Sequence, residues 1–269
     1  MVINFFYFRL YIFFFSFFPC LFIFDLFFPL RSFLAQTNTI EFTNKNKDIR
    51  RLVSVLVVYD DKVAGSGVIF SDPKKGLWIA TNKHVIQSRK FLCIQTYDGV
   101  RHPGRFVEVK ELSGKDLAFI WINPKSKYLS ANKLLFPTSS ILFPRSVTAV
   151  GFPFLLNQSS AVYTERKGFI VSLLRRPLED GLELTYSSDI DKGMSGGGIF
   201  FSNNTIVGLN SAHSNPLWDF EYRYSNGELV PALLSKALQK VAIGIPSSLI
   251  SASLPLLLAP NIVPHHFCK

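Results

Sequence analysis

A serine set among glycines is the first residue of this chain whose surroundings suit chemistry. Ser195 lies in the segment Gly193-Met194-Ser195-Gly196-Gly197-Gly198, and a strand-like apolar run follows it. Glycine adopts the positive φ angles that let consecutive backbone N–H groups converge on one point. Converging N–H groups stabilise an oxyanion, so we interpret the segment as a nucleophile loop in which Gly193 and Ser195 supply the oxyanion hole.

A nucleophilic serine needs a base and an acid that orients the base, and the chain offers one of each beside a predicted strand. His84 follows a strand-like run, where a side chain would emerge at the rim of a sheet, and Asp116 opens the apolar run 117–122. Each alone is more often structural, although a buried carboxylate at Asp116 requires a partner. Together they predict one mechanism: Asp116 orients the imidazole, His84 takes the proton of Ser195, and Ser195 attacks a carbonyl carbon.

Short apolar runs bounded by turn residues predict an all-β protein that carries these side chains. The runs are rich in Val, Ile, Phe and Thr and cover residues 52–59, 67–70, 77–80, 91–96, 117–122, 146–151, 167–174, 182–186, 198–201 and 205–210. A stretch with three prolines, 123–144, divides them into two clusters, which indicates two similar β-units with a site between them. One amphipathic helix is predicted at 231–241, with Leu233 and Leu238 on its apolar face and Gly244 and Pro246 at its end.

The N-terminal part of the chain is its most apolar part. Residues 10–30 are rich in phenylalanine, with Asp25 as their one charge. Two interpretations stay open for residues 1–35: a signal peptide cleaved near Gln36, or an uncleaved membrane anchor, since the run is long enough to span a bilayer. Both predict an exported protein, periplasmic or secreted. We assign 36–49 to a linker, 50–255 to the folded domain, with its β-units at about 50–130 and 140–250, and 256–269 to a tail.

The charge and the cysteine content limit the kinds of ligand and partner that we expect for this protein. The formal net charge is +10, but the basic residues are scattered and do not alternate with aromatic residues as on a nucleic-acid-binding surface. The three cysteines, Cys20, Cys93 and Cys268, have no spacing typical of a disulfide framework or a metal site. His265 and His266 near Cys268 are interpreted as part of a frayed tail. We therefore expect no nucleic acid, no metal and no cofactor, with membrane association only through residues 10–30.

Five segments carry a resemblance to a known family. They are Gly65-Ser66-Gly67-Val68-Ile69-Phe70, Ala80-Thr81-Asn82-Lys83-His84-Val85-Ile86, Lys115-Asp116-Leu117-Ala118-Phe119-Ile120, Gly193-Met194-Ser195-Gly196-Gly197 and Val207-Gly208-Leu209. In this order, over about residues 50–250, the chain resembles the trypsin-like (chymotrypsin-fold) serine peptidases, in particular the bacterial exported branch with HtrA-type and glutamyl-endopeptidase-like enzymes. The resemblance implies two antiparallel six-stranded β-barrels with a C-terminal helix, a triad between the barrels, and serine endopeptidase activity on proteins or peptides through an acyl-enzyme.

The chain departs from the family pattern at three points. Met194 stands where animal digestive enzymes carry an aspartate that receives a new N-terminus on zymogen cleavage, which makes that route of activation doubtful here. Gly198 replaces a usual proline. No C-terminal stretch is long enough for a peptide-binding PDZ domain, so the likeness to HtrA-type enzymes is expected to stop at the protease domain.

The resemblance also suggests residues for the primary specificity pocket, Asp189, Asn210, Ser211 and His213. Asp189, six residues before Ser195, would select Lys or Arg, whereas His213 would favour an acidic side chain, and both alternatives stay open.

Three rival interpretations compete with a peptidase. A protease fold that binds peptides or serves as a membrane-anchored scaffold without cleaving them is the main one, although all three residue types of the triad are present. A membrane protein defined by its apolar N-terminus is another. The α/β-hydrolase reading of Gly-x-Ser-x-Gly requires a helix after the serine and an acid and a histidine downstream, and the strand-like run after Ser195 argues against it.

Overall fold

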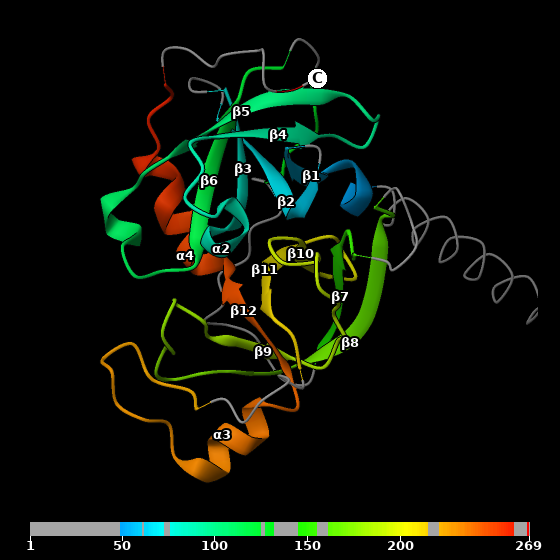
Figure 1. Cartoon of the computed structure of the whole chain (residues 1–269). Coiled ribbons are helices and arrows are strands. Elements are labelled where there is room, and N and C mark those ends of the chain that lie inside the picture. The colour runs from blue at the N-terminus through cyan, green and yellow to red at the C-terminus, as the bar shows by residue number, and fades with distance from the viewer. Residues whose placement is uncertain are drawn as a thin grey trace, which may run out of the picture. The chain divides into compact units, whose positions relative to one another are not determined.

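The computed structural model describes residues 49–60, 62–72, 76–124, 127–131, 145–154, 161–214, 221–260 and 268 (Figure 1). The predicted signal peptide or anchor, most of the linker, and His265 and His266 lie outside these residues. None of the helices in the described ranges is long and apolar enough to cross a membrane.

Two closed antiparallel barrels of six strands each make up the folded part, which confirms the predicted fold class. Barrel one has the strand order β1-β2-β3-β6-β5-β4. Its strands are β1 (Ser54–Tyr59), β2 (Lys62–Asp72), β3 (Gly76–Asn82), β4 (Phe91–Gln95), β5 (Arg101–Val107) and β6 (Leu117–Ile122). Barrel two has the order β10-β11-β12-β9-β8-β7. Its strands are β7 (Arg145–Gly151), β8 (Thr164–Leu173), β9 (Leu184–Tyr186), β10 (Gly198–Phe201), β11 (Ile206–Ala212) and β12 (Ala242–Pro246).

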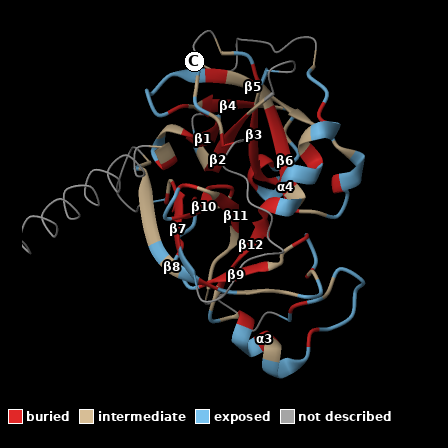
Figure 2. Ribbon diagram, turned by 180° about the vertical axis from the view of Figure 1, so that it is seen from behind, coloured by how far each residue is buried: buried red, intermediate tan, exposed pale blue. Residues whose placement is uncertain are grey.

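Most of the apolar runs become strands that are buried on both faces, as the burial colours of Figure 2 show, whereas β8 is half-buried or exposed along most of its length. Side chains alternate between the two faces of a strand. In β3, Ile79 packs inside barrel one, whereas Trp78 and Ala80 belong to a second apolar cluster shared by both barrels. In β10, Ile199 packs inside barrel two and Phe200 joins the shared cluster. The continuous apolar runs therefore follow from strands that fill a barrel on one side and bury the interface on the other.

Two strands were missed because their sequences contain residues that usually end strands. In β5, Pro103 and Gly104 interrupt the apolar pattern, yet the strand pairs with both β4 and β6. Gly244 and Pro246, predicted to terminate a helix, instead belong to β12, which pairs with β11 and β9. A Cβ atom on Gly244 would lie 2.4 Å from the Leu209 carbonyl oxygen, so only glycine allows this close approach of the backbones.

The predicted helix exists but is shorter than expected. It is α3 (Ala232–Leu238), in which Leu238 is buried while Leu233, assigned to the apolar face, is 85% exposed. The C-terminal end of α3 is therefore packed against the rest of the protein, whereas its N-terminal end, which the periodicity also assigned to the apolar face, is exposed. The helix α4 (Ser247–Ser253) follows β12 and was not predicted; its Ile250 joins the shared apolar cluster. The remaining short helices are α2 (Lys83–Ile86), η1 (Lys110–Leu112) and η4 (Leu254–Leu256).

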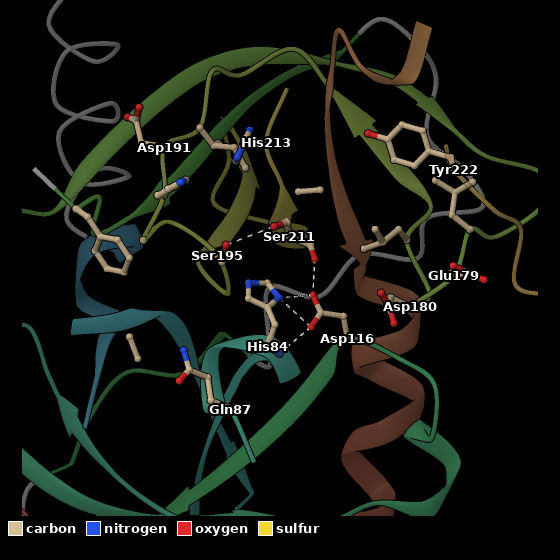
Figure 3. Close-up of a pocket in the computed structure, with 18 of the residues that line it drawn as sticks. His84, Gln87, Asp116, Glu179, Asp180, Asp191, Ser195, Ser211, His213 and Tyr222 are labelled. Carbon is tan, nitrogen blue, oxygen red and sulfur yellow. Dashed lines mark hydrogen bonds and ion pairs between the residues drawn. The ribbon is translucent and has the colours of Figure 1, made fainter. Parts of the chain in front are cut away.

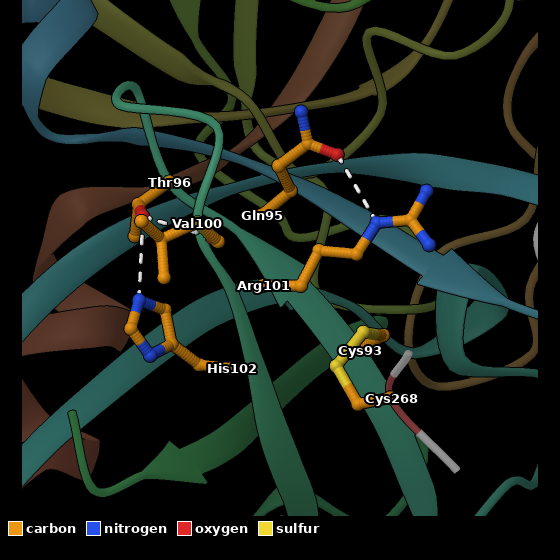
Figure 4. The surroundings of a disulfide bond; sticks show 7 residues. All are labelled: Cys93, Gln95, Thr96, Val100, Arg101, His102 and Cys268. Atoms are coloured by element: carbon orange, nitrogen blue, oxygen red, sulfur yellow. Dashed lines mark hydrogen bonds between the residues drawn. A yellow bond between two sulfur atoms is a disulfide. The ribbon is translucent and has the colours of Figure 1, made fainter.

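Two of the cysteines form a disulfide that their spacing in the sequence did not predict. Cys93 in β4 and Cys268 form a disulfide across a sequence separation of 175 residues (Figure 4). The bond ties the C-terminal end of the chain to barrel one, beside Leu56 and Val58 of β1. Local spacing gave no sign of it, because the two cysteines are 175 residues apart and only the tertiary structure brings them together.

Candidate active site

A cavity of about 580 Å³ is lined by residues of both barrels (Figure 3). His84 and Asp116 come from barrel one, and Gly193 and Ser195 come from barrel two. The structure thus brings the three predicted reactive residues and the proposed oxyanion loop to the wall of one cavity.

His84 is positioned by the ends of two paired strands. Asn82, the last residue of β3, lies opposite Leu117 at the start of β6, so the chain leaves β3 beside Asp116. The Asn82 side-chain amide and the Lys83 backbone N–H both donate to the Asp116 carbonyl oxygen, each over 3.1 Å. The one-turn helix α2 then begins, and its buried Val85 and Ile86 leave the His84 side chain 51% exposed toward the cavity.

Asp116 fixes the orientation and the tautomer of His84. Its side chain is 10% exposed, and its two oxygens lie 3.0 and 2.9 Å from His84 Nδ1. The His84 backbone N–H and the Ser211 hydroxyl also donate to this carboxylate, over 3.0 and 2.5 Å. Because a carboxylate can only accept, Nδ1 carries the proton and Nε2 of the neutral ring is left as an acceptor. The ring is therefore arranged to take up a proton on Nε2.

Ser195 lines the same cavity and comes from barrel two. Its hydroxyl donates to the Ser211 carbonyl oxygen over 3.3 Å. Across the described residues, no hydrogen bond joins Ser195 Oγ to the His84 ring. Catalytic hydrogen bonds in free enzymes are often long or poorly aligned and shorten when substrate binds. The hydroxyl needs only a rotation about its side-chain bonds to leave the Ser211 carbonyl.

The loop before Ser195 has the backbone conformation that the glycine suggested. Gly193 has a φ of +96°. A Cβ there would lie 2.6 Å from the Phe152 carbonyl oxygen, so a larger residue has neither the conformation nor the space. Within the described part of the chain, the backbone N–H groups of Gly193 and Ser195 donate to no protein acceptor. Both donors are thus available to a ligand oxygen.

The four residues predicted for the specificity pocket separate into two groups. Ser211 and His213 line the cavity. Asn210 is fully buried, with its side chain hydrogen-bonded to Tyr186, Val150 and Met194. Asp189 is exposed and is not among the lining residues. The His213 ring donates from Nδ1 to the Ser214 carbonyl oxygen over 2.8 Å, which leaves Nε2 as its second polar atom.

Sequence reasoning missed a second wall of the cavity. It consists of Leu178, Glu179 and Asp180 in the β8–β9 connection together with Tyr222 and Arg223. The Asp180 carbonyl oxygen accepts from the Asp116 backbone N–H over 2.8 Å, which joins this connection to barrel one. Burial, and next the negative charge of Asp116, raise the pKa of Asp180 above its usual value. No local sequence pattern predicted that these residues line the cavity, because their position depends on how the β8–β9 connection folds against barrel one.

Two six-stranded antiparallel barrels with a cavity lined by both are the architecture of the chymotrypsin-like peptidases. Residues 65–209 match the family model described as trypsin-like peptidase domain, and the chain belongs to that family.

Several curated proteases are similar to this chain over part of their length. The chain is 30% identical over 151 residues to the periplasmic pH-dependent serine endoprotease DegQ of Escherichia coli, covering 55% of this chain and 31% of DegQ. It is 32% identical over 152 residues to the periplasmic serine endoprotease DegP of Salmonella typhimurium, covering 55% of this chain and 30% of DegP. It is 29% identical over 159 residues to the magnetosome formation protease MamE of Magnetospirillum gryphiswaldense, covering 56% and 19%. The matched region thus spans a third or less of the length of these relatives.

Proposed function

We propose that this protein is a serine endopeptidase that hydrolyses peptide bonds with Ser195 as nucleophile, His84 as general base and acid, and Asp116 as the residue that orients His84. The observation that carries the proposal is the Asp116–His84 hydrogen bond of 2.9 Å on the wall of the cavity that Ser195 also lines. Membership of a peptidase family supports proteins or peptides as the substrates.

In the first half of the reaction, Ser195 Oγ bonds to the substrate carbonyl carbon while its proton passes to His84 Nε2. The negative charge moves to the carbonyl oxygen, which the free N–H groups of Gly193 and Ser195 stabilise. The C–N bond then breaks, His84 returns the proton to the leaving amine, and an acyl-enzyme remains. Water attacks the ester in the same way, so that the acid is released and the Ser195 hydroxyl restored.

We also propose that the protein is exported, with residues 1–35 as a signal peptide or membrane anchor ahead of a protease domain at 50–255. DegQ and DegP are periplasmic proteins by name. The Cys93–Cys268 disulfide supports the proposal independently, because disulfides persist mainly in oxidising compartments.

The test of the activity is covalent labelling with a fluorophosphonate probe. The wild-type protein should be labelled at one serine, and Ser195→Ala should remove the label. Ser225→Ala, which removes an exposed hydroxyl that does not line the cavity, is the matched control and should be labelled like the wild type. If the folded wild-type protein stays unlabelled, the non-cleaving peptide-binding scaffold becomes the better proposal, and the Ser195–Ser211 hydrogen bond would then be its resting arrangement.

A further inference from the structure

We propose that Ser66 and Asn210 are positioning residues that hold the oxyanion hole in its active shape before substrate arrives, an inference that rests on the peptidase function proposed above. The two side chains come from different barrels, Ser66 from β2 and Asn210 from β11, and both are fully buried. Each donates a hydrogen bond to a carbonyl oxygen of the nucleophile loop.

Asn210 sets the direction of the Ser195 N–H group together with the Gly197 backbone N–H, which also donates to the Met194 carbonyl oxygen, over 3.0 Å. A trans peptide is planar, so the Met194 carbonyl and the Ser195 N–H belong to one rigid unit and point in opposite directions. The Asn210 Nδ2 atom donates to the Met194 carbonyl oxygen over 3.1 Å and to the Val150 carbonyl oxygen over 2.9 Å. The Tyr186 hydroxyl donates to Asn210 Oδ1 over 2.8 Å, which fixes the orientation of the amide. The carbonyl is thus held on the buried side, and the N–H is left for the cavity.

Ser66 fixes the preceding peptide in the same way. Its hydroxyl donates to the Gly193 carbonyl oxygen over 2.8 Å and accepts from the Phe152 N–H over 2.9 Å. Because a hydroxyl has one proton and Phe152 N–H is itself a donor, that proton must go to Gly193. The Ser66 backbone N–H also donates to the Ser195 carbonyl oxygen over 2.9 Å. One residue of barrel one therefore holds the loop on both sides of Met194.

The Gly193 N–H shares its peptide with the Lys192 carbonyl, and that carbonyl accepts from the Phe154 N–H over 2.7 Å. Both proposed oxyanion donors therefore belong to peptides whose carbonyl oxygens are already bonded elsewhere. Rotating either peptide to hide its N–H would break the hydrogen bond of its carbonyl oxygen. For the Met194 carbonyl the partner lost is the amide of the fully buried Asn210, and leaving such a group unpaired is costly.

These neutral hydrogen bonds hold the loop without the ion pair that an aspartate and a new N-terminus form in animal digestive enzymes. Met194, where animal digestive enzymes carry the aspartate that receives a new N-terminus, is fully buried in an apolar cluster with Ile190 and Ile199. A thioether cannot form that ion pair. Gly151 leaves the space for this arrangement, since a Cβ there would lie 2.8 Å from Met194 Cα and 2.9 Å from Ser66 Oγ.

The experiment measures fluorophosphonate labelling of Ser195 over a range of probe concentrations, with the rate expressed per folded molecule. The phosphoryl oxygen of the probe occupies the position of the oxyanion, so the limiting rate reports on the hole and the half-saturating concentration on binding. Ser66→Ala should lower the limiting rate by about tenfold to a hundredfold with little change in half-saturation, since losing one oxyanion donor costs about 10² to 10³. Its control is Ser54→Ala, which removes an equally buried hydroxyl that donates to the Arg50 carbonyl oxygen, away from the loop.

Asn210→Ala is the second variant and should lower the limiting rate to a similar extent. Thr185→Val is its control, because it removes a buried hydroxyl of the same barrel that donates to the Ser172 carbonyl oxygen over 3.0 Å and does not contact the nucleophile loop. If Ser66→Ala does not fold, Ser66→Cys gives the same comparison, since a thiol is a weak donor of similar size. Limiting rates within about threefold of the controls would overturn the inference and leave the peptidase function standing. An unlabelled wild-type protein would overturn both at the first measurement.

Discussion

The Asp116 carboxylate allows the sharpest prediction about the proposed mechanism. Asp116→Asn keeps the size and most of the hydrogen bonds, because the remaining oxygen still accepts from His84 and the new amide can donate to the Ser211 hydroxyl, which then acts as acceptor. The main change is the loss of the negative charge beside the ring. We therefore expect the variant to fold normally and to fail in catalysis.

The size of the loss follows from the geometry. When His84 takes the proton of Ser195, its positive charge forms 2.9 Å from the nearer Asp116 oxygen. Two unit charges about 3 Å apart attract by about 5 kcal/mol at an effective dielectric constant of about 20. The His84 side chain is 51% exposed, so solvent screening reduces this attraction. A remaining effect of about 4 kcal/mol corresponds to a loss of about 10³ in kcat/KM.

The assay is the second-order rate constant of fluorophosphonate labelling at neutral pH, with thermal unfolding as a check on the fold. Ser211→Ala is the matched control, because it removes the 2.5 Å hydrogen bond to the same carboxylate but leaves the charge. Its loss should stay near tenfold, about 1.4 kcal/mol, as for one hydrogen bond to a charged group. If Asp116→Asn loses less than about tenfold, the electrostatic role of Asp116 is wrong.

Two further predictions concern stability. Cys268→Ser should lower the free energy of unfolding by about 2–5 kcal/mol in urea titrations, since the bond to Cys93 closes a loop of 175 residues and so restricts the unfolded chain. Burial lowers the pKa of His102, whose Nε2 lies 3.0 Å from the Tyr128 hydroxyl. The unfolded chain therefore takes up a proton more readily, so stability should fall as pH drops below about 6.5, and His102→Gln should weaken that dependence.

Each of the two stability predictions can be contradicted by a specific measurement. A Cys93→Ser, Cys268→Ser double variant should match the single variant, and a loss under about 0.5 kcal/mol would contradict the role of the cross-link. Urea titrations of wild type and His102→Gln at about pH 5.5 and pH 7.5 should give different changes with pH; parallel changes would exclude His102 as their source.

Local patterns were enough to single out the residues that the structure places around one cavity. A serine among glycines, a histidine after one apolar run and an aspartate before another are readable because each depends on a few neighbouring residues. The composition and length of the apolar runs were likewise enough for ten of the strands. Most of these are buried on both faces and must therefore be apolar along their length, although β8 is partly exposed. The run 117–122 coincides with β6, the strand that Asp116 opens.

The tertiary structure decided what joins these parts. Asn210, interpreted from the sequence as a pocket residue, holds a carbonyl of the nucleophile loop instead. Ser66 reaches Gly193 across 127 residues, and Cys93 reaches Cys268 across 175. These contacts depend on how two closed barrels lie against each other, and short-range spacing carries no information on that geometry. The sequence alone therefore determined which residues could react, whereas only the folded chain decided which buried side chains hold the nucleophile loop.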